Sequence, residues 1–224
     1  RVIGKKGIGS VAALGHVGCR YVQGASISCF GDLYVLGFAN QIEAVAGGSF
    51  VLLGDQPTLA GGKVYAGDVV DVGDLGSGRA HETIVELCSE TFYERLDDAY
   101  SLLRTAFREN PPAAIKKQIL GDRAFAHRME AIRTRMTALR EALGSIWKKG
   151  EAENHIRVRG RAHPGTLVRI GRRFLDLDET HSSVRFFLRG MSIGISEFSK
   201  LNVSPTKGGS SGASEARGGV VESS

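Results

Sequence analysis

Apolar positions in the first eighty residues recur as strand, corner and strand. Four stretches align without gaps, namely VAALGHVGC (11–19), ISCFGDLYV (27–35), AVAGGSFVL (44–52) and VYAGDVVDV (64–72). In each stretch, apolar or small residues occupy the first, third, seventh and ninth positions. The fifth position is glycine in three of them (Gly15, Gly31 and Gly48) and Asp68 in the fourth. Residues two apart face the same side of a strand. Each unit therefore directs two side chains inward before the corner and two after it, and glycine permits the sharp turn between them.

These units predict a parallel β-helix. The offsets between them are 16, 17 and 20 residues, a length that suits one coil. A single unit cannot bury its inward side, whereas stacked units form continuous apolar columns. We expect the fourth unit to be the last full coil before a change of pattern at about residue 89. Cys19 and Cys29 fall in inward columns, and with Cys88 they are expected to be buried, reduced thiols.

Helical periodicity replaces the alternation from residue 89 to about 149. The apolar residues follow a 4-3-4-3 spacing, first through Phe92, Leu96, Ala99, Leu103 and Ala106, and later through Phe125, Met129, Ile132, Met136, Leu139, Leu143 and Ile146. This heptad pattern is typical of a coiled-coil seam. Asn110-Pro111-Pro112 breaks or kinks the first arm. The pattern predicts an antiparallel hairpin of 89 to about 120 and 122 to about 149, and leaves open whether its seam is filled by the same chain or by a second one.

Strand-like alternation returns in the C-terminal third. The stretches NHIRVRGRAHPGTLVRIG (154–171) and SSVRFFLRGMSIGI (182–195) are expected to cap or extend the solenoid and to hide an open edge. From Ser204 onward the chain is rich in Ser and Gly, which favours a disordered tail. The expected parts are a β-helix (1–88), a coiled-coil hairpin (89–150), return strands packed on the β-helix (151–203) and the tail (204–224).

Charge is unevenly distributed along the 224 residues. The net charge is −5 over residues 1–103, +11 over 104–173 and −1 over 174–224. The outer face of the second helical arm carries five arginines without interleaved aromatic residues, a pattern that disfavours nucleic acid. We expect them to bind a protein partner by charge complementarity: Arg123, Arg128, Arg133, Arg135 and Arg140. No apolar run is long enough to span a membrane.

No catalytic or cofactor-binding constellation stands out. The glycines match neither phosphate-binding pattern, GxGxxG or GxxxxGK[ST], at a strand-to-helix junction. His16 lies at a corner, where hexapeptide-repeat acyltransferases use a histidine, but the coil offsets lack their six-residue spacing. His155, His163 and His181 have no metal-ligand spacing. We therefore expect no catalytic residue, no cofactor and no metal, and a protein that is not an enzyme.

Three stretches carry a family resemblance: LAGGKVYAGDVVDVGDLGS before the helices, HETIVEL leading into them, and IRVRGRAHPGTLVRIG after them. In this order they resemble the flagellar assembly protein A (FapA-like) family, which commonly has Tyr-Pro-Gly where this chain has His163-Pro164-Gly165. The resemblance covers roughly residues 8–200. It implies a right-handed, single-stranded parallel β-helix with an inserted, projecting hairpin, mainly β with some α. It also implies a bacterial, cytoplasmic, non-enzymatic role. The family's N-terminal domain is expected to be missing, because Arg1 begins within the pattern.

These observations favour a structural or interaction module that presents a basic arm to a protein partner, in flagellar assembly or its regulation. One alternative is a self-assembling scaffold whose solenoid ends stack, as in β-helical filament proteins or septum-placement inhibitors. A second and weaker alternative is a solenoid acyltransferase that uses His16. Homo-oligomers through the coiled coil or the solenoid ends are compatible with the pattern.

Overall fold

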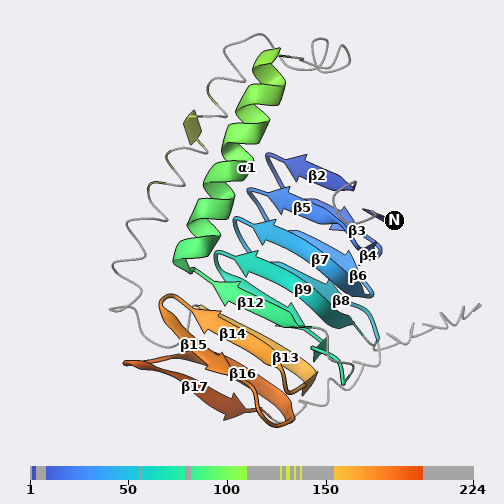
Figure 1. The fold of residues 1–224 in the computed structure, drawn as a ribbon, viewed down its shortest axis with the longest axis vertical. Coiled ribbons are helices and arrows are strands. Elements are labelled where there is room, and N and C mark those ends of the chain that lie inside the picture. Colours follow the sequence, from blue (N-terminus) through green and yellow to red (C-terminus); the bar gives the residue numbers. More distant parts are fainter. Residues whose placement is uncertain are drawn as a thin grey trace, which may run out of the picture.

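The computed structural model describes residues 2–3, 9–55, 57–78, 82–109 and 154–198, together with residues 127, 130, 131, 134 and 137. Most of these residues form strands that stack as a parallel β-solenoid, with one helix lying against its side (Figure 1). The structure therefore confirms the predicted β-solenoid.

The strands form three ladders around the solenoid axis, which we name A, B and C. Ladder A contains β2 (Ser10–Ala13), β5 (Ser26–Cys29), the second halves of β7 (Ala39–Ala46) and β9 (Thr58–Ala66), then β12 (Thr83–Leu87) and β14 (Thr166–Ile170). Ladder B contains β3 (Val17–Cys19), β6 (Leu33–Leu36), β8 (Phe50–Leu53), β10 (Val69–Val72) and β13 (His155–Ala162). Ladder C contains β1 (Val2–Ile3), β4 (Val22–Gln23), the first halves of β7 and β9, and β11 (Asp74–Leu75), which pairs with the end of β13.

The register between coils is the one that the sequence alignment predicts. In ladder A, Val11 pairs with Ile27, Ile27 with Ala44, and Ala44 with Val64. Ladder B pairs the aligned residues after the corner in the same way. From the second coil onward the inward side chains are fully buried, and they form one continuous apolar core.

The corner between ladders A and B is also stacked in register. Each corner residue donates its backbone N–H to the carbonyl of the corner residue in the preceding coil: Gly31 to Gly15 at 3.1 Å, Gly48 to Gly31 at 3.0 Å, and Asp68 to Gly48 at 3.2 Å. Asp68 therefore fills the place of a corner glycine without interrupting the column, because these bonds use only the backbone.

The fourth unit is the last complete coil before residue 89, and the return strands extend the solenoid beyond it, as expected from the sequence. β12 pairs with β9 in ladder A, with Val85 opposite Val64. β13 pairs with β10 in ladder B, with Ile156 opposite Val70. These two strands are the halves of a fifth coil that residues 89–154 divide at its corner. The pattern before residue 89 is too short to reveal this coil, because its second half lies more than sixty residues downstream.

Beyond the fifth coil the strands turn antiparallel. β14 still pairs in parallel with β12, but β15 (Arg173–Asp176) folds back on β14. On the other side, β16 (His181–Arg189) runs antiparallel to β13, and β17 (Ser192–Glu197) runs antiparallel to β16. The C-terminal strands thus both extend the stack and change its direction of pairing at the end opposite β2 (Figure 1).

The helix α1 (Glu90–Glu109) ends directly before Asn110-Pro111-Pro112. It lies lengthwise on ladder A and passes β12, β9, β7, β5 and β2 (Figure 1). The predicted seam residues Phe92, Leu96, Ala99 and Leu103 are buried against the solenoid. The first arm is therefore a helix packed on a sheet, which corrects the expectation that its seam faces a second helix. In the described part, no helix is long and apolar enough to cross a membrane.

We predict that Gly47→Ala destabilises the protein. A Cβ at Gly47 would lie 2.5 Å from the carbonyl oxygen of Phe30 and 3.0 Å from its Cα, so backbone would have to move. We expect the free energy of unfolding to fall by about 1–3 kcal/mol, measured by urea denaturation. Gly18→Ala is the matched control, because a Cβ at Gly18 meets nothing within 4 Å. Equal stability of the two variants would contradict the close stacking at this corner.

Candidate interaction surfaces

The start of α1 is tied to the solenoid by a buried polar cluster. Ser89 Oγ donates a hydrogen bond to Glu86 Oε2 at 2.5 Å and accepts one from the backbone N–H of Phe92 at 3.0 Å, which caps the helix. Glu86, on β12, is only 5% exposed, and Arg169 on β14 lies 3.3 Å from its other oxygen. Two strands of ladder A therefore hold the first turn of the helix in place.

The rest of α1 follows the stack coil by coil. Its buried residues contact Phe30, Val45 and Tyr65, which point outward from successive coils of ladder A. One helical turn rises about 5.4 Å, close to the spacing of about 4.8 Å between hydrogen-bonded strands. Residues three or four apart on α1 therefore meet successive coils. This near match explains why a coiled-coil spacing in the sequence corresponds to helix-on-solenoid packing in the structure.

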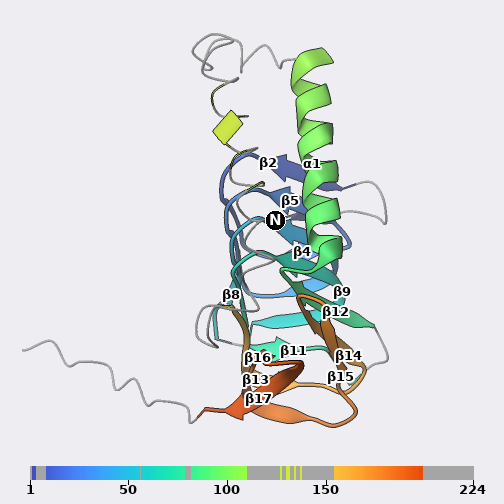
Figure 2. The same cartoon turned by 90° about the vertical axis from the view of Figure 1, so that its left-hand side faces the viewer.

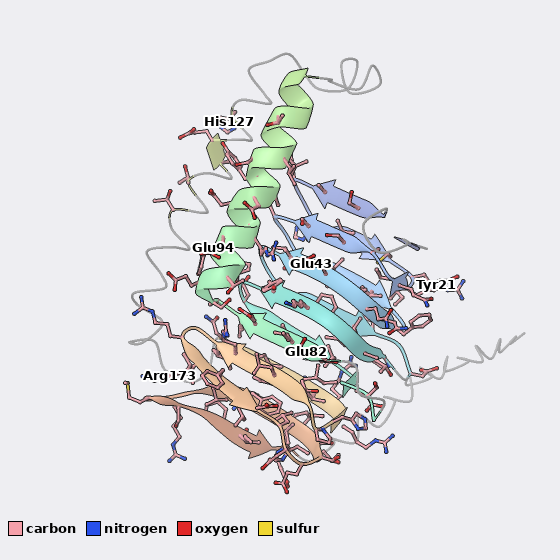
Figure 3. The ribbon with its side chains drawn as sticks, viewed as in Figure 1. Tyr21, Glu43, Glu82, Glu94, His127 and Arg173 are labelled. Atoms are coloured by element: carbon pink, nitrogen blue, oxygen red, sulfur yellow. The ribbon has the colours of Figure 1, made fainter. Side chains whose placement is uncertain are left out.

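A groove with a mixed polar and apolar lining runs along one flank of α1, with a volume of about 520 Å³. Its floor is formed by Ser26, Ser28 and Glu43 of ladder A, and Glu43 lies beside the helix (Figure 3). Arg95 of α1 lies 3.6 Å from Glu43, and both side chains are about half exposed. The exposure of both side chains shows that the groove is open to solvent and is not part of the core. A pair this exposed also adds little stability.

The five candidate arginines, Arg123, Arg128, Arg133, Arg135 and Arg140, lie outside the described residues. Within that segment the structure describes five positions, all helical and exposed: His127, Glu130, Ala131, Thr134 and Thr137. Their offsets from His127 of 3, 4, 7 and 10 residues place them on one helix face.

An exposed apolar stripe on ladder B and the corner that follows it was not identified by the sequence analysis. It consists of the half-buried Tyr21 and the exposed Tyr34, Leu36, Phe38 and Leu53, with Leu36 58% exposed. Tyr21 and Phe38 stack with ring centroids 5.3 Å apart, and Leu36 pairs with Leu53 across neighbouring strands. The stripe and α1 lie on different sides of the stack (Figures 2 and 3). Strand alternation gives the outward direction of Leu36 and Leu53, but not that no other described element covers these side chains.

A larger recess of about 1320 Å³ lies where β13, β16 and β17 meet the loops after β8 and β10. Arg157 and Arg159 enter it from β13 and share Asp71, at 3.9 and 2.9 Å respectively. Arg157 also lies over the Phe198 ring, 4.9 Å from its centroid. Asp71 therefore balances one of these two positive charges, and Arg157 has an aromatic contact as well.

Histidine chemistry gains little support from the geometry. Nδ1 of His16 accepts a hydrogen bond from the backbone N–H of Asp32 at 2.9 Å, and the side chain is 66% exposed. Neither the groove nor the recess includes His16 in its lining. No group of three or more potential metal ligands occurs among the residues that the structure describes. The corner histidine therefore serves as a backbone hydrogen-bond acceptor.

The three cysteines carry free thiols. Burial, with a smaller contribution from Asp32, raises the pKa of Cys29 to about 12. Burial, with a smaller contribution from Asp68, raises the pKa of Cys88 to about 12. The Cys88 thiol also donates a hydrogen bond to the Gly67 carbonyl at 2.6 Å. Since the thiolate is the reactive form, these two thiols are structural, as expected from the sequence.

Comparison with known proteins adds one finding to this geometry. A family model described as the Flagellar Assembly Protein A beta solenoid domain matches residues 2–193. No curated protein and no solved structure gives a significant match.

We predict that Ser89→Ala lowers the free energy of unfolding by about 1–2 kcal/mol, because it removes a helix cap and a partner of the buried Glu86 carboxylate. Ser101→Ala is the control, since Ser101 is exposed on the same helix and alanine favours helix. Chemical denaturation followed by circular dichroism measures the difference. A Ser89→Ala variant as stable as Ser101→Ala would show that the Ser89 cap and its hydrogen bond to Glu86 do not stabilise the protein.

We predict that the buried thiols make stability fall at alkaline pH. An unfolded cysteine ionises near about pH 8.5, whereas Cys29 and Cys88 ionise near 12 in the folded protein. Their contribution is therefore complete below about pH 8.5 and is lost as the pH rises toward 12. Urea midpoints measured between pH 8 and 10 should decline, and a thiol-reactive dye should label these two residues only after unfolding. Because Cys19 is only partly buried, the labelling uses a Cys19→Ser variant. Rapid labelling of that variant in its native state would contradict the burial of Cys29 and Cys88.

Proposed function

The chain belongs to the Flagellar Assembly Protein A family of β-solenoid domains, and from this premise we propose that it is a non-enzymatic scaffold of flagellar assembly or its regulation. In this role a rigid solenoid presents its helical insertion to a protein partner in the bacterial cytoplasm. The family match supports the link to flagellar assembly, and the packing of α1 supports the role of the insertion.

The observation that supports the proposal most directly is that α1 is held in one position on the solenoid. The helix is capped by Ser89, and it is buried along one flank against several coils. An insertion attached only at its ends would adopt many orientations. Binding a partner would then restrict these orientations, and the lost conformational entropy would lower the affinity. Here the first helix is already ordered by the solenoid, so the chain leaves α1 from a defined point at the β2 end of the stack.

The segment after α1 is proposed to return as the second arm of a hairpin. Helical periodicity places the seam residues from Phe125 to Ile146 on one side of such a helix. The exposed positions His127, Glu130, Ala131, Thr134 and Thr137 fall on the opposite side. This arrangement supports an amphipathic arm, with its apolar side available to another surface of the same chain or to a second chain.

The five arginines of that arm are the proposed partner-binding residues, acting by charge complementarity with an acidic protein surface. The arm lies within the segment 104–173, whose net charge is +11, and this supports an electrostatic contribution to capture. Such contacts at the rim of an interface mainly affect the association rate and its dependence on salt. No cofactor is required by this role.

We predict that replacing the five arginines, Arg123, Arg128, Arg133, Arg135 and Arg140, by glutamate abolishes function. The test expresses the full chain in a flagellated bacterium that lacks its own copy of this protein, and measures swimming in soft agar. We expect the charge-reversed variant to leave motility at the level of the deletion strain, because it repels the partner.

The matched control replaces the same five residues by lysine, which keeps the charge but not the planar guanidinium group. We expect lysine to retain most of the motility, since the proposed contribution is charge. Full motility of the glutamate variant, at equal protein levels, would remove the arm from the proposed function.

A further inference from the structure

The last strand of the solenoid has an open edge. β17 pairs with β16 along one side only, and within the described residues no strand pairs with its other side. Its register with β16 is unbroken from Ser192 to Glu197, so no bulge turns the edge away. The strand contains neither proline nor lysine, the residues that commonly protect an edge. β17 is therefore a backbone template for another strand.

The orientation of its backbone groups can be deduced from one hydrogen bond. The N–H of Phe198 donates to the carbonyl of Ser183 at 2.8 Å, which makes these two a hydrogen-bonded pair. In antiparallel strands such pairs alternate, so Ser192, Gly194 and Ser196 use their backbone groups toward β16. The N–H and C=O groups of the intervening residues, Ile193 and Ile195, point to the open edge.

The strand sequence is symmetric about Gly194. Read in either direction, residues 192–196 are Ser-Ile-Gly-Ile-Ser. A two-fold axis at Gly194 places Ile193 opposite Ile195 of a second copy and Ser192 opposite Ser196. The isoleucine pairs are the ones whose free backbone groups face the edge, so each pair can exchange two hydrogen bonds. The symmetric sequence and the backbone orientation thus agree on one register.

Apolar and charged side chains at this end fit the same arrangement. Ile195 lies on the side of the sheet that includes the fully buried Phe186, yet it is 40% exposed because nothing in the described structure covers it. The two-fold axis also brings Glu197 opposite Met191 of the second copy. Arg173 donates a hydrogen bond to the Met191 sulfur at 3.3 Å and lies at this end of the stack (Figure 3). In such a strand pair, Arg173 of each copy would lie on the side of Glu197 of the other copy.

From these observations we propose that two copies of this chain dimerise end to end, through antiparallel pairing of β17 with β17 about a two-fold axis at Gly194. The pairing continues ladder B from one solenoid into the other and covers Ile195 of both copies. Such an isologous contact closes on itself, so it yields a dimer and not a filament.

Sedimentation velocity of the full chain at low and high micromolar concentration tests the pairing. We expect the wild type to form a dimer, and Ile195→Lys to raise the dissociation constant by more than about tenfold, because it places a charge at the edge. Leu36→Lys is the matched control, an exposed leucine on the same ladder far from β17, and it should dimerise normally. A monomeric wild type, an Ile195→Lys protein that dimerises as tightly as the wild type, or a monomeric Leu36→Lys protein would each overturn the proposal.

A disulfide experiment tests the register. Ser192 and Ser196 of opposite chains would form non-hydrogen-bonded pairs, whose Cα separation of about 4.5 Å is within the range for a disulfide. The double variant Ser192→Cys/Ser196→Cys should therefore give a reducible, covalently linked dimer on oxidation. Each single variant places its cysteine opposite serine and should stay unlinked. Linking of a single variant, or no linking of the double variant, would refute the two-fold axis at Gly194.

Discussion

In-register stacking of one coil on the next is the constraint on which the other features depend. Hydrogen-bonded strands lie about 4.8 Å apart, so every coil must repeat its corner and its inward side chains at that spacing. Gly31 and Gly48 keep the backbone close at the corner, and Asp68 is tolerated because only its N–H is used. The same spacing lets α1 contact successive coils with successive turns. A helix with an apolar stripe of heptad type can thus pack on this solenoid almost as it would pack on another helix.

The sequence predicts the register of the first four coils because their pattern is local: alternation shows which residues point inward, and glycine marks the corner. It does not predict the fifth coil, since Val85 and Ile156 belong to one coil but lie seventy-one positions apart. Heptad spacing specifies the width of an apolar stripe and not the surface that it faces. The coiled-coil interpretation of Phe92 to Leu103 was therefore wrong about the partner, although it was right about the buried side.

The candidate surfaces illustrate a further limit of sequence analysis. The alternation of side chains along the strand shows that Leu36 points outward, but its exposure depends on whether another element covers ladder B. The role of Glu86 is likewise visible only in three dimensions, because Ser89 is its near neighbour in sequence whereas Arg169 comes from a distant strand. For β17, the symmetric sequence is readable in advance, but the free edge beside it is not.

The divided corner of the fifth coil also bears on how such proteins diversify. Asn154 Nδ2 lies 3.5 Å from Cys88 Sγ, so the chain leaves and re-enters the solenoid at one point. In the first four coils, the corner between ladders A and B consists of two or three residues. Residues inserted after α1 can accordingly change in length or content while the coils on either side keep their register, whereas α1 itself is packed against the stack. The solenoid with α1 is then a constant framework, and the insertion that follows α1 is the segment that evolution or protein engineering can replace.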